Sequence, residues 1–314
     1  MAEKPLVSVV IPTHNRQEKL MRLIASVRAS DYPQDRIELI VVDDASSDGT
    51  ADRLRRDAPD ITVVRNDPEL LLAGSRNAGI ERSRGELVFL IDDDNVLDNS
   101  CISCLVASFS EPSNLKVGIL APVALYLSSP DTVWWKGTGR SMVTSATVLM
   151  GRGEKYKGDG EMVRTVDCIN AFMVRKEVFD QVGRFDSNAF PIHYDEADFG
   201  ERVRRAGYEM FVNTRCRTWH DISPPDHKED RSRAYHCQNE MRAYFCAKNR
   251  ATFHGRYSRP IERLTFFMLF NWAISAVYLE VLLSDHKNPT ERRWSLAKAY
   301  LRGLADGWKD LVRS

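Results

Sequence analysis

Apolar runs and amphipathic stretches alternate over the first part of the chain. Four runs rich in β-branched and aliphatic residues predict strands that are buried on both faces: 6–11, 37–42, 61–65 and 86–91. Between them, apolar residues recur with helical spacing behind polar capping residues, over about 16–29, 48–56 and 76–82. This order predicts an α/β domain with a mostly parallel sheet and helices on both of its faces.

The second part of the chain has a looser pattern. We expect helices near 101–109, 176–182 and 195–206, strands near 117–126, 168–175, 208–212 and 215–219, and hairpin-like material from 134 to 166. After Arg231 the pattern is helical throughout. The expected organisation is therefore an α/β domain over 1–225 followed by a C-terminal helical region over 226–314.

The most hydrophobic stretch of the chain lies in the helical region, at 264–283. Its length is close to the roughly 20 apolar residues that span a bilayer, but Asn271 and Glu280 interrupt it. Three interpretations stay open. The stretch packs on the protein's own core or on a partner subunit, inserts shallowly into one membrane face, or spans the membrane.

Composition and charge exclude several classes of protein. Hydrophobic residues make up 43% of the 314 residues and 44 basic residues balance 44 acidic ones, so neither disorder nor a nucleic-acid partner is indicated. The N-terminus carries no export signal, so we expect a cytoplasmic protein with reduced thiols at all six cysteines. The motifs GxGxxG after a strand, GxxxxGK and GxSxG are absent, which argues against the common nucleotide-binding and hydrolase classes.

Polar side chains follow three of the predicted parallel strands at the point where each strand ends. The clusters are Thr13–Arg16, Asp43–Asp48 and Asp92–Asn95. In parallel sheets, ligands bind beyond the carboxyl ends of the strands. We therefore expect the three clusters to meet at one binding edge.

Three consecutive aspartates, Asp92, Asp93 and Asp94, end the fourth strand. Mg²⁺ and Mn²⁺ are hard cations that prefer carboxylate oxygens and keep positions for water and phosphate. Because side chains alternate along an extended chain, we expect Asp92 and Asp94 to share a cation against a diphosphate, with Asp93 pointing to a sugar or to the loop. An EF-hand is excluded because Leu97 stands where that loop requires glycine.

Two further places suit a nucleotide. Asp43 and Asp44 can accept hydrogen bonds from a base or a ribose, with helix capping as the other interpretation. Arg76 and Asn77 follow Gly74 at an expected helix start, where Arg76 would neutralise a phosphate. An exposed helical arginine is the alternative there.

Six blocks of the sequence resemble family 2 glycosyltransferases, in the same order and at about the same spacing. They are VSVVIPTHNR, VVDDASSDGT, AGSRNAGIERSRGE, FLIDDDN, NAFMVRKEVFDQVGRFD and YDEADFGERVRRAGYEM, within residues 6–220. The resemblance implies a GT-A fold, with a donor half over about 1–97 and an acceptor half over about 98–225. It also implies an inverting transfer of a sugar from a UDP-, GDP- or dTDP-sugar to a hydroxyl of a glycan, polysaccharide or lipid-linked acceptor.

The resemblance further implies roles for individual residues on the donor side. Asp92 and Asp94 match the Asp-X-Asp metal motif of the family, and His220 matches a histidine that assists the metal or the diphosphate, with a lone surface histidine as the alternative. The implied cofactor is Mn²⁺ or Mg²⁺. The expected donor-binding residues are Pro12, Thr13, Asn15, Arg16, Asp43, Asp44, Gly74, Arg76, Asn77, Asp92 and Asp93.

The catalytic base is expected at Glu196 or Asp195. The family carries a Glu-Asp pair whose second member resembles the base, and this chain reverses the pair, so that the longer Glu196 stands at the base position. Either carboxylate stays open as the base, and we favour Glu196. Asn170, Ala171 and Phe172 precede it along the chain and are expected to frame the acceptor pocket, with a purely structural strand as the alternative.

Two other functions stay open. A sugar-phosphate nucleotidyltransferase would also place a nucleotide and a metal on a related sheet. A catalytically inactive nucleotide- or glycan-binding protein would tolerate the altered base position. The C-terminal helices are expected to serve peripheral contact with the inner face of the cell membrane, or an oligomer contact.

Overall fold

The computed structural model describes residues 3–222, 237, 239–285 and 288–313. They form two compact units. The sheet unit contains the described residues of 3–139, 149–187 and 199–222, and the helical unit contains 140–148, 188–198 and the described residues from 237 onward. The part of the expected helical region that covers 226–236 lies outside the described residues.

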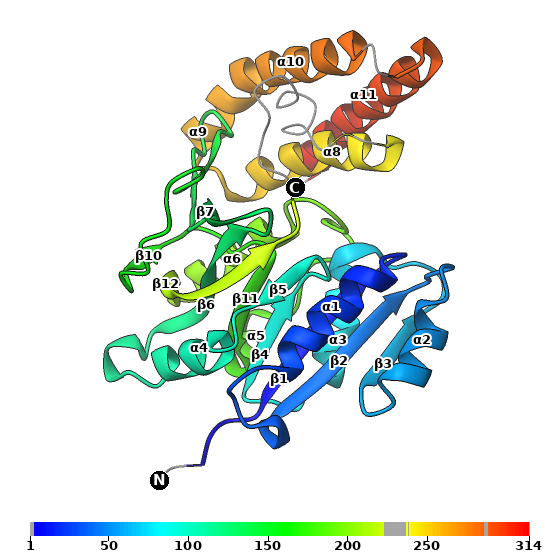
Figure 1. The fold of residues 1–314 in the computed structure, drawn as a ribbon. Helices are drawn as coiled ribbons and strands as arrows, with labels where there is room; N and C mark the ends of the chain where they lie inside the picture. The colour runs from blue at the N-terminus through cyan, green and yellow to red at the C-terminus, as the bar shows by residue number, and fades with distance from the viewer. Residues whose placement is uncertain (1–2, 223–236, 238, 286–287, 314) are drawn as a thin grey trace. The chain divides into compact units, whose positions relative to one another are not determined.

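The first half of the sheet unit is a parallel sheet built from repeated strands and helices (Figure 1). The strands are β1 (Val7–Thr13), β2 (Ile37–Asp44), β3 (Thr62–Asn66) and β4 (Leu87–Ile91), and the helices are α1 (Gln17–Arg28), the 3-10 turn η1 (Gln34–Arg36), α2 (Thr50–Asp57) and α3 (Leu71–Arg82). The strand order is β3-β2-β1-β4 and each pair is parallel. The register sets Thr13 beside Asp43 and Asp43 beside Arg65, so the carboxyl ends of β1, β2 and β3 line up.

The second half of the sheet unit extends this sheet with strands of both directions. Beyond β4 the order is β11-β6-β12-β10, with β5 paired to β12 and β7 paired to β6. The elements are β5 (Asn95–Leu97), α4 (Cys101–Phe109), η2 (Pro112–Asn114), β6 (Val117–Tyr126), β7 (Ser129–Trp135), β10 (Met162–Arg164), β11 (Ala171–Arg175), α5 (Lys176–Val182), α6 (Asp195–Arg205) and β12 (Glu209–His220). The two short strands expected at 208–212 and 215–219 are one strand, because β12 keeps its pairing with β6 across an irregularity between Asn213 and Arg217.

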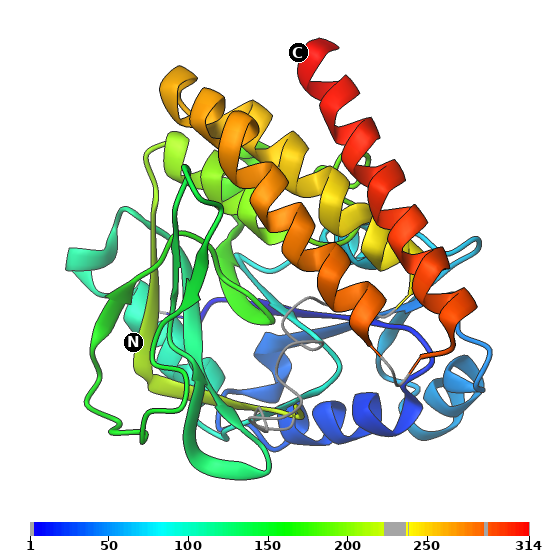
Figure 2. The ribbon, with the colours of Figure 1, turned by 90° about the horizontal axis from the view of Figure 1, so that it is seen from above.

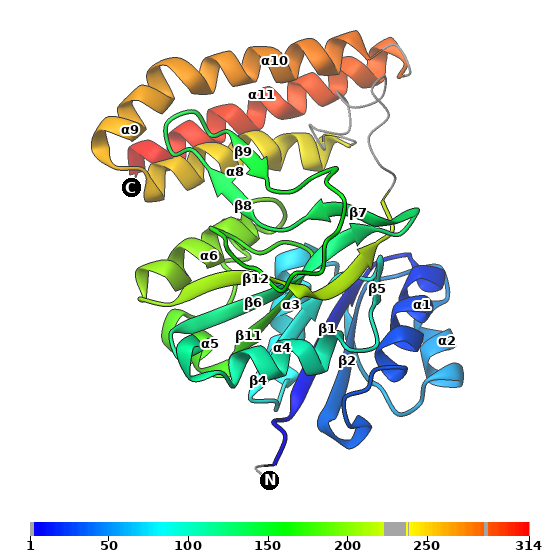
Figure 3. The same ribbon diagram turned by 60° about the vertical axis from the view of Figure 1, so that its left-hand side comes forward.

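Helices cover both faces of the sheet (Figure 3). Apolar side chains form one core on each face. Val9 and Ile11 of β1 belong to the core that also contains apolar residues of α1, α2 and α4. Val10 belongs to the core on the opposite face, with residues of α3, α5 and α6. Successive residues of a strand point to opposite faces, which explains why the runs in β1 and β4 are apolar at consecutive positions.

The cysteines differ in part from the expectation. Cys104 on α4 and Cys216 on β12 form a disulfide, whereas Cys101, Cys168, Cys237 and Cys246 are free and buried. The expectation of six reduced thiols is therefore wrong for this pair. The two residues are 112 positions apart in the sequence, and only the packing of α4 against β12 brings their Cα atoms to 5.6 Å, within disulfide range.

The helical unit consists mainly of three long helices that lie alongside one another (Figure 2). Its elements are α8 (Glu240–Tyr257), α9 (Pro260–Thr265), the π-helical turn η3 (Phe266–Phe270), α10 (Asn271–Ser284) and α11 (Thr290–Arg313). The short strands β8 (Thr138–Arg140) and β9 (Thr147–Leu149) pair where the chain passes between the units. Helices α8 and α11 approach closely at Gly303, where a Cβ atom would come within 2.1 Å of the carbonyl oxygen of Tyr244.

One continuous helical stretch of the helical unit, Pro260–Ser284, has the length and composition of a membrane span, with a mean hydropathy of 1.8. One third of its most apolar window, 33%, is buried inside the protein. Length and composition alone do not distinguish a membrane-spanning helix from a core helix. The distinction depends on which residues of the helix are buried in the protein and which are exposed.

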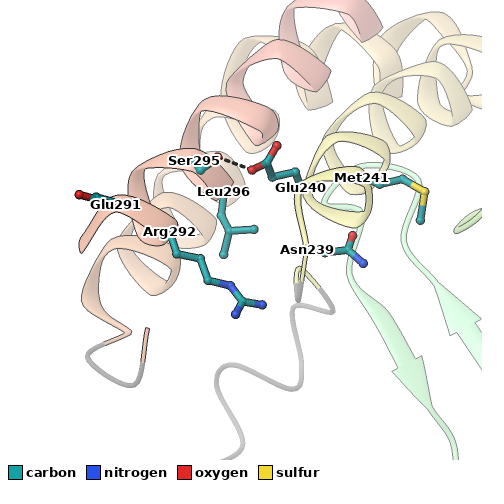
Figure 4. A pocket seen from close by; sticks show the side chains of 7 residues that line it. All are labelled: Asn239, Glu240, Met241, Glu291, Arg292, Ser295 and Leu296. Atoms are coloured by element: carbon teal, nitrogen blue, oxygen red, sulfur yellow. Dashed lines mark hydrogen bonds between the residues drawn. The ribbon is translucent and has the colours of Figure 1, made fainter. Parts of the chain in front are cut away.

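An open pocket of about 740 Å³ lies in the same unit, at the N-terminal ends of α8 and α11 (Figure 4). Ser295 donates a hydrogen bond to Glu240 beside it. None of the residues expected to bind a ligand lines it. The lining residues are Asn239, Glu240, Met241, Glu291, Arg292, Ser295 and Leu296.

Candidate functional site

The loops at the carboxyl ends of β1, β2 and β4 are joined by hydrogen bonds. The backbone N–H of Asn15 donates to Ser46 Oγ over 3.0 Å, which joins the loops after β1 and β2. Arg16 reaches the loop after β4, where its Nη1 lies 3.1 Å from Asp93 Oδ1 and 2.9 Å from Asp94 Oδ2. The three polar clusters expected from the sequence therefore meet at one edge of the sheet.

Pro12 and Thr13 end β1, and both are buried. Thr13 Oγ1 donates to Asp93 Oδ2 over 2.7 Å. Thr13 thus fixes the position of the middle aspartate, and the donor-binding role of Pro12 stays a prediction.

The three aspartates divide differently from the expected alternation. Asp92 Oδ1 accepts a hydrogen bond from Arg76 Nη2 over 2.9 Å. Arg16 bonds both Asp93 and Asp94, and the expectation that Asp92 and Asp94 share a cation stays a prediction. The chain turns at 93–94, and a turn breaks the period of two on which the expectation rested.

Asp94 and His220 converge from different segments. His220 ends β12, and its Nε2 lies 3.3 Å from Asp94 Oδ1. The backbone N–H of Asp221 also donates to the carbonyl oxygen of Asp94 over 2.8 Å. His220 is only 8% exposed and its ring meets that of Trp134 at a centroid distance of 4.2 Å, so the interpretation as a lone surface histidine is wrong.

Burial affects the two inner carboxylates with different net results. Burial raises the pKa of Asp93 to about 6, and the charge of Arg16 offsets only part of that effect. Burial also works to raise the pKa of Asp94, but the hydrogen bond and charge of His220, together with Arg16, outweigh it and leave that pKa below its ordinary value. Asp94 is therefore fully ionised near neutral pH.

The residues at this edge fit a divalent cation that takes few protein ligands. The described part of the chain contains no group of three or more His, Cys, Asp or Glu side chains that could hold a metal. Mg²⁺ keeps several waters and is held by one or two carboxylates together with substrate phosphates, and adjacent ligands of an octahedral cation lie about 3 Å apart. The 3.3 Å between Asp94 Oδ1 and His220 Nε2 is close to that separation. Nδ1 of His220 is buried with no hydrogen-bond partner among the described residues, so Nε2 is the ring atom that the protein turns toward a carboxylate.

Asp43 and Asp44 are buried at the end of β2 and form hydrogen bonds to the end of β3. Arg65 Nη1 donates to Asp43 Oδ2 over 2.8 Å, and Asn66 Nδ2 donates to Asp44 Oδ1 over 2.7 Å. The capping interpretation is wrong for both aspartates, because Asp48 accepts from the N–H of the first residue of α2. Arg65 and Asn66 were not expected, although the rule that ligand residues follow parallel strands, applied to β3, would have found them.

Gly74 and Arg76 lie inside a helix and not at its start. Helix α3 begins at Leu71, and Gly74 lies close to the residue before it, since a Cβ atom at position 74 would lie 2.7 Å from Leu70 Cβ. Arg76 is 1% exposed and its guanidinium lies over the ring of Phe172 at 5.7 Å. The interpretation as an exposed helical arginine is therefore wrong. Arg76 is a buried cation whose charge faces Asp92.

Asn77 has a structural role. Its Nδ2 donates to the carbonyl oxygen of Phe185 over 2.8 Å, and its Oδ1 accepts from the N–H of the same residue over 3.0 Å. Both ends of the amide thus bind one backbone segment. The expected donor-binding role of Asn77 stays a prediction, and the contacts that the structure gives its side chain are with the loop that follows α5.

Asn170, Ala171 and Phe172 are interior residues. Ala171 and Phe172 are 2% and 1% exposed in β11, which lies between β4 and β6. Asn170 exchanges two hydrogen bonds with Asn95, of 2.8 and 3.1 Å, behind the aspartates. For Ala171 and Phe172, the burial of the side chains favours the alternative interpretation, a purely structural strand, over the expected acceptor role.

The two candidates for the base lie in the first turn of α6, in residues that belong to the helical unit. Asp195 is buried at 2% exposure, whereas Glu196 is partly exposed. Glu196 is thus the more accessible of the two carboxylates, and its role as the base stays a prediction. Asp198, two positions later, is fully buried and accepts a hydrogen bond from Tyr257 over 2.5 Å. Tyr257 lies on α8, far along the chain, so the sequence did not indicate that it contacts Asp198.

The sequence model of Glycosyl transferase family 2 matches residues 8–183, more than half of the 314 residues. The chain belongs to this family. Its relatives include the probable glycosyltransferase YdaM of Bacillus subtilis (strain 168), which is 25% identical over 225 residues, or 70% of this chain and 51% of that protein. A segment of 115 residues, 34% of this chain, is 34% identical to 35% of the GalNAc(5)-diNAcBac-PP-undecaprenol beta-1,3-glucosyltransferase of Campylobacter jejuni. The matched segments cover about half of the length of YdaM and about a third of the length of the Campylobacter protein.

A solved structure confirms the GT-A fold of this family chain. The mannosyltransferase PcManGT of Pyrobaculum calidifontis, in complex with GDP-Man and Mn²⁺, superimposes with a TM-score of 0.58 at 18% identity. The match covers 98% of this chain and 88% of that one. The expected fold and family are therefore correct, and at this identity the likeness carries the fold alone.

Proposed function

We propose that the chain is a metal-assisted, inverting glycosyltransferase that moves a sugar from a nucleoside diphosphate sugar to a hydroxyl group. The observation that carries the proposal is the convergence of Asp94 and His220, 3.3 Å apart, at the edge where the loops after β1, β2 and β4 meet. Similar proteins support it, since PcManGT was solved with GDP-Man and Mn²⁺. The proposed localisation is the cytoplasm, at the inner face of the membrane.

On the donor side, Asp94 and His220 would hold Mn²⁺ or Mg²⁺. A cation bound there supplies Lewis-acid stabilisation of the negative charge that develops on the leaving diphosphate. Arg76 is a permanently charged, buried guanidinium held by Asp92, and Arg16 is an exposed one held by Asp93 and Asp94. Both suit a diphosphate, because each can exchange part of its carboxylate contact for phosphate oxygens.

The nucleoside is proposed to contact Asp43 and Asp44. Both carboxylates are buried and already oriented by Arg65 and Asn66, so their oxygens are fixed before a ligand arrives. Fixed acceptors select a base or ribose by the position of its N–H and O–H donors. We do not assign the base, since carboxylates accept from uracil and from guanine alike.

On the acceptor side, Glu196 is proposed as the general base that takes the proton of the attacking hydroxyl. It stands in the first turn of α6, where the helix dipole favours the ionised carboxylate that a base requires. The Campylobacter relative acts on a diphospho-undecaprenol glycan, and we propose a glycan or lipid-linked acceptor here as well.

Donor turnover tests this function directly. The full chain is incubated with Mn²⁺ and separate UDP-, GDP- and dTDP-sugars, and free nucleoside diphosphate is measured. We expect Asp94→Asn to lower turnover at least a hundredfold and Glu196→Gln to abolish transfer while nucleotide binding persists. Asp98→Asn is the matched control, since Asp98 pairs with Arg217 over 2.7 Å outside the proposed set. Turnover by Asp94→Asn equal to that of Asp98→Asn would refute the metal role, and pyrophosphate release from NTP and sugar phosphate would indicate a nucleotidyltransferase.

The helical unit is proposed to bind the surface of an anionic bilayer. The stretch 264–279 contains no charged residue, and four large apolar side chains along the same helical stretch are strongly exposed: Ile261 at 70%, Leu264 at 59%, Met268 at 63% and Trp272 at 54%. A contiguous apolar face of this kind on one helix is typical of proteins that lie in a membrane interface.

The opposite face of α10 argues for lying on the membrane instead of spanning it. Asn271 and Ser275 are buried there and accept hydrogen bonds from Arg250 of α8, at 3.3 and 3.0 Å. A helix that keeps one polar face packed against its own protein offers only the other face to lipid. Exposed Lys298 and Arg302 on α11 supply positive charge in the same unit, which favours an anionic surface.

Flotation with vesicles tests the membrane contact. The full chain should float with phosphatidylglycerol vesicles and less with phosphatidylcholine vesicles. The triple variant Leu264→Gln, Met268→Gln, Trp272→Gln should remain in the bottom fraction, whereas Leu115→Gln, which removes an apolar side chain of 75% exposure elsewhere, should float. No flotation of the unaltered chain, with a dimer mass in solution, would show that this face is an oligomer contact.

A further inference from the structure

The loop that leads into α6 has an unusual backbone. His193 and Tyr194 are consecutive residues with φ angles of 62° and 61°, in the left-handed region. Non-glycine residues rarely adopt this region because of steric strain, so two in succession persist only where surrounding contacts hold them. The carboxylates Asp195 and Glu196 follow directly.

Helix α8 provides one such contact. Asn249 is fully buried, and its Nδ2 donates to the carbonyl oxygens of Ile192 and His193, over 2.8 and 3.0 Å. One amide group thus binds two successive carbonyls of the left-handed loop. Buried backbone carbonyls need hydrogen-bond partners, and Asn249 serves as one for both of them.

The same helix holds the first turn of α6 two helical turns further along. Tyr257 donates to Asp198 Oδ1 over 2.5 Å, and Asp198 is fully buried. Between the two contacts, the ring of Phe253 packs against Tyr194 and Tyr257 at centroid distances of 5.3 and 5.1 Å. Asn249, Phe253 and Tyr257 are four positions apart in sequence and therefore lie on one face of α8. This face contacts both the loop and the start of α6.

We infer that Asn249 and Tyr257 are positioning residues that fix the orientation of the base, Glu196. Glu196 lies between the two points that α8 holds, the loop at 192–193 and Asp198. Its partly exposed carboxylate must meet an acceptor hydroxyl within hydrogen-bond reach, and an error of about 1 Å in such a placement can lower a rate on the order of a hundredfold. The inference rests on the proposed function, because it assigns a purpose to the contacts only if Glu196 acts as the base.

Tyr257→Phe tests the inference, with Tyr244→Phe as the matched control. Tyr244 lies on the same helix and donates a comparable hydrogen bond, over 3.1 Å, to Asp306 of α11. Both variants lose one hydroxyl bonded to an aspartate, but only Tyr257 contacts α6. We expect Tyr257→Phe to lower kcat at least tenfold while KM for the donor and Kd for UDP or GDP stay within twofold. Tyr244→Phe should keep kcat within twofold.

Asn249→Leu supplies a second, independent variant, and hydrogen exchange a second readout. In both Asn249→Leu and Tyr257→Phe, the amides of 192–198 should exchange faster than in the unaltered chain, while those of β1 stay unchanged. Equal kcat for Tyr257→Phe and Tyr244→Phe, or a loss of activity that matches the unfolded fraction, would overturn the inference. If the unaltered chain transfers sugar and Glu196→Gln is inactive, such a result leaves the proposed function standing. If Glu196→Gln transfers sugar normally, the base assignment fails and the inference fails with it.

Discussion

A buried histidine of the helical unit should make the stability of the protein sensitive to acid. His254 lies on α8 with 0% exposure and stacks on Phe266, with ring centroids 3.9 Å apart. Burial lowers the pKa of His254 to about 3, the positive charges of Arg140 and Arg250 add to the effect, and a backbone hydrogen bond and Glu262 oppose it. The imidazole is therefore neutral in the folded protein throughout the physiological range.

The sign of the effect follows from a pKa that is lower in the folded than in the unfolded chain. An unfolded histidine titrates near 6.5, so above that pH neither state binds the proton and the stability is fully present. As the pH falls from 6.5 toward 3, only the unfolded state binds the proton, and the free energy of unfolding decreases. The decrease from His254 is about 2 kcal/mol at pH 5 and on the order of 5 kcal/mol below pH 3.

Urea unfolding of the unaltered chain and of His254→Gln, each at pH 7 and pH 5, measures this contribution. The variant should be less stable at pH 7, because it loses the stacked ring. Its free energy of unfolding should nevertheless fall by about 2 kcal/mol less between pH 7 and pH 5 than that of the unaltered chain. Other titrating groups are common to both proteins and cancel in the comparison. An equal decrease in both would refute the assignment of a neutral, buried imidazole.

Two further outcomes can be measured without substrate. Gly303→Ala should lower the free energy of unfolding by about 3 kcal/mol or more, because the new Cβ would meet the backbone of Tyr244. Gly139→Ala is the control: no atom lies within 4 Å of its Cβ, so the free energy of unfolding should change by less than about 1 kcal/mol. Urea titrations measure both values. Alkylation in denaturant without reductant should modify four of the six cysteines by intact mass, since Cys104 and Cys216 are bonded, and modification of all six would contradict the disulfide.

Much of the parallel half of the fold could be predicted from the sequence. The strands β1, β2 and β4 end where apolar runs meet polar residues, and the same local pattern located the site, because parallel strands bring their carboxyl ends to one edge. The insertion of β11, antiparallel, between β4 and β6 could not be predicted, since strand order depends on pairings between distant segments. The disulfide was missed for the same reason: no local pattern relates Cys104 to Cys216.

The start of α3 shows a different kind of limit. The sequence predicted a helix from about Arg76, after Gly74, yet the helix begins five residues earlier, at Leu71. A Cβ atom at position 74 would lie 2.7 Å from Leu70 Cβ, a close approach that exists only in the folded chain. Arg76 therefore reaches the site from inside a helix, as a buried cation with a carboxylate partner.

The roles of the three aspartates could be interpreted only in part from the sequence. Alternation predicted that Asp93 contacts a sugar or the loop, and its carboxylate is held from two sides, by Thr13 of β1 and by Arg16 of the following loop. Its pKa of about 6 indicates a carboxylate whose burial is only partly offset by these partners. Such a group is retained when it fixes geometry. We conclude that Asp93 anchors the loop after β1 to the loop after β4, and that this anchor leaves Asp92 and Asp94, on either side of it, pointing to Arg76 and to His220.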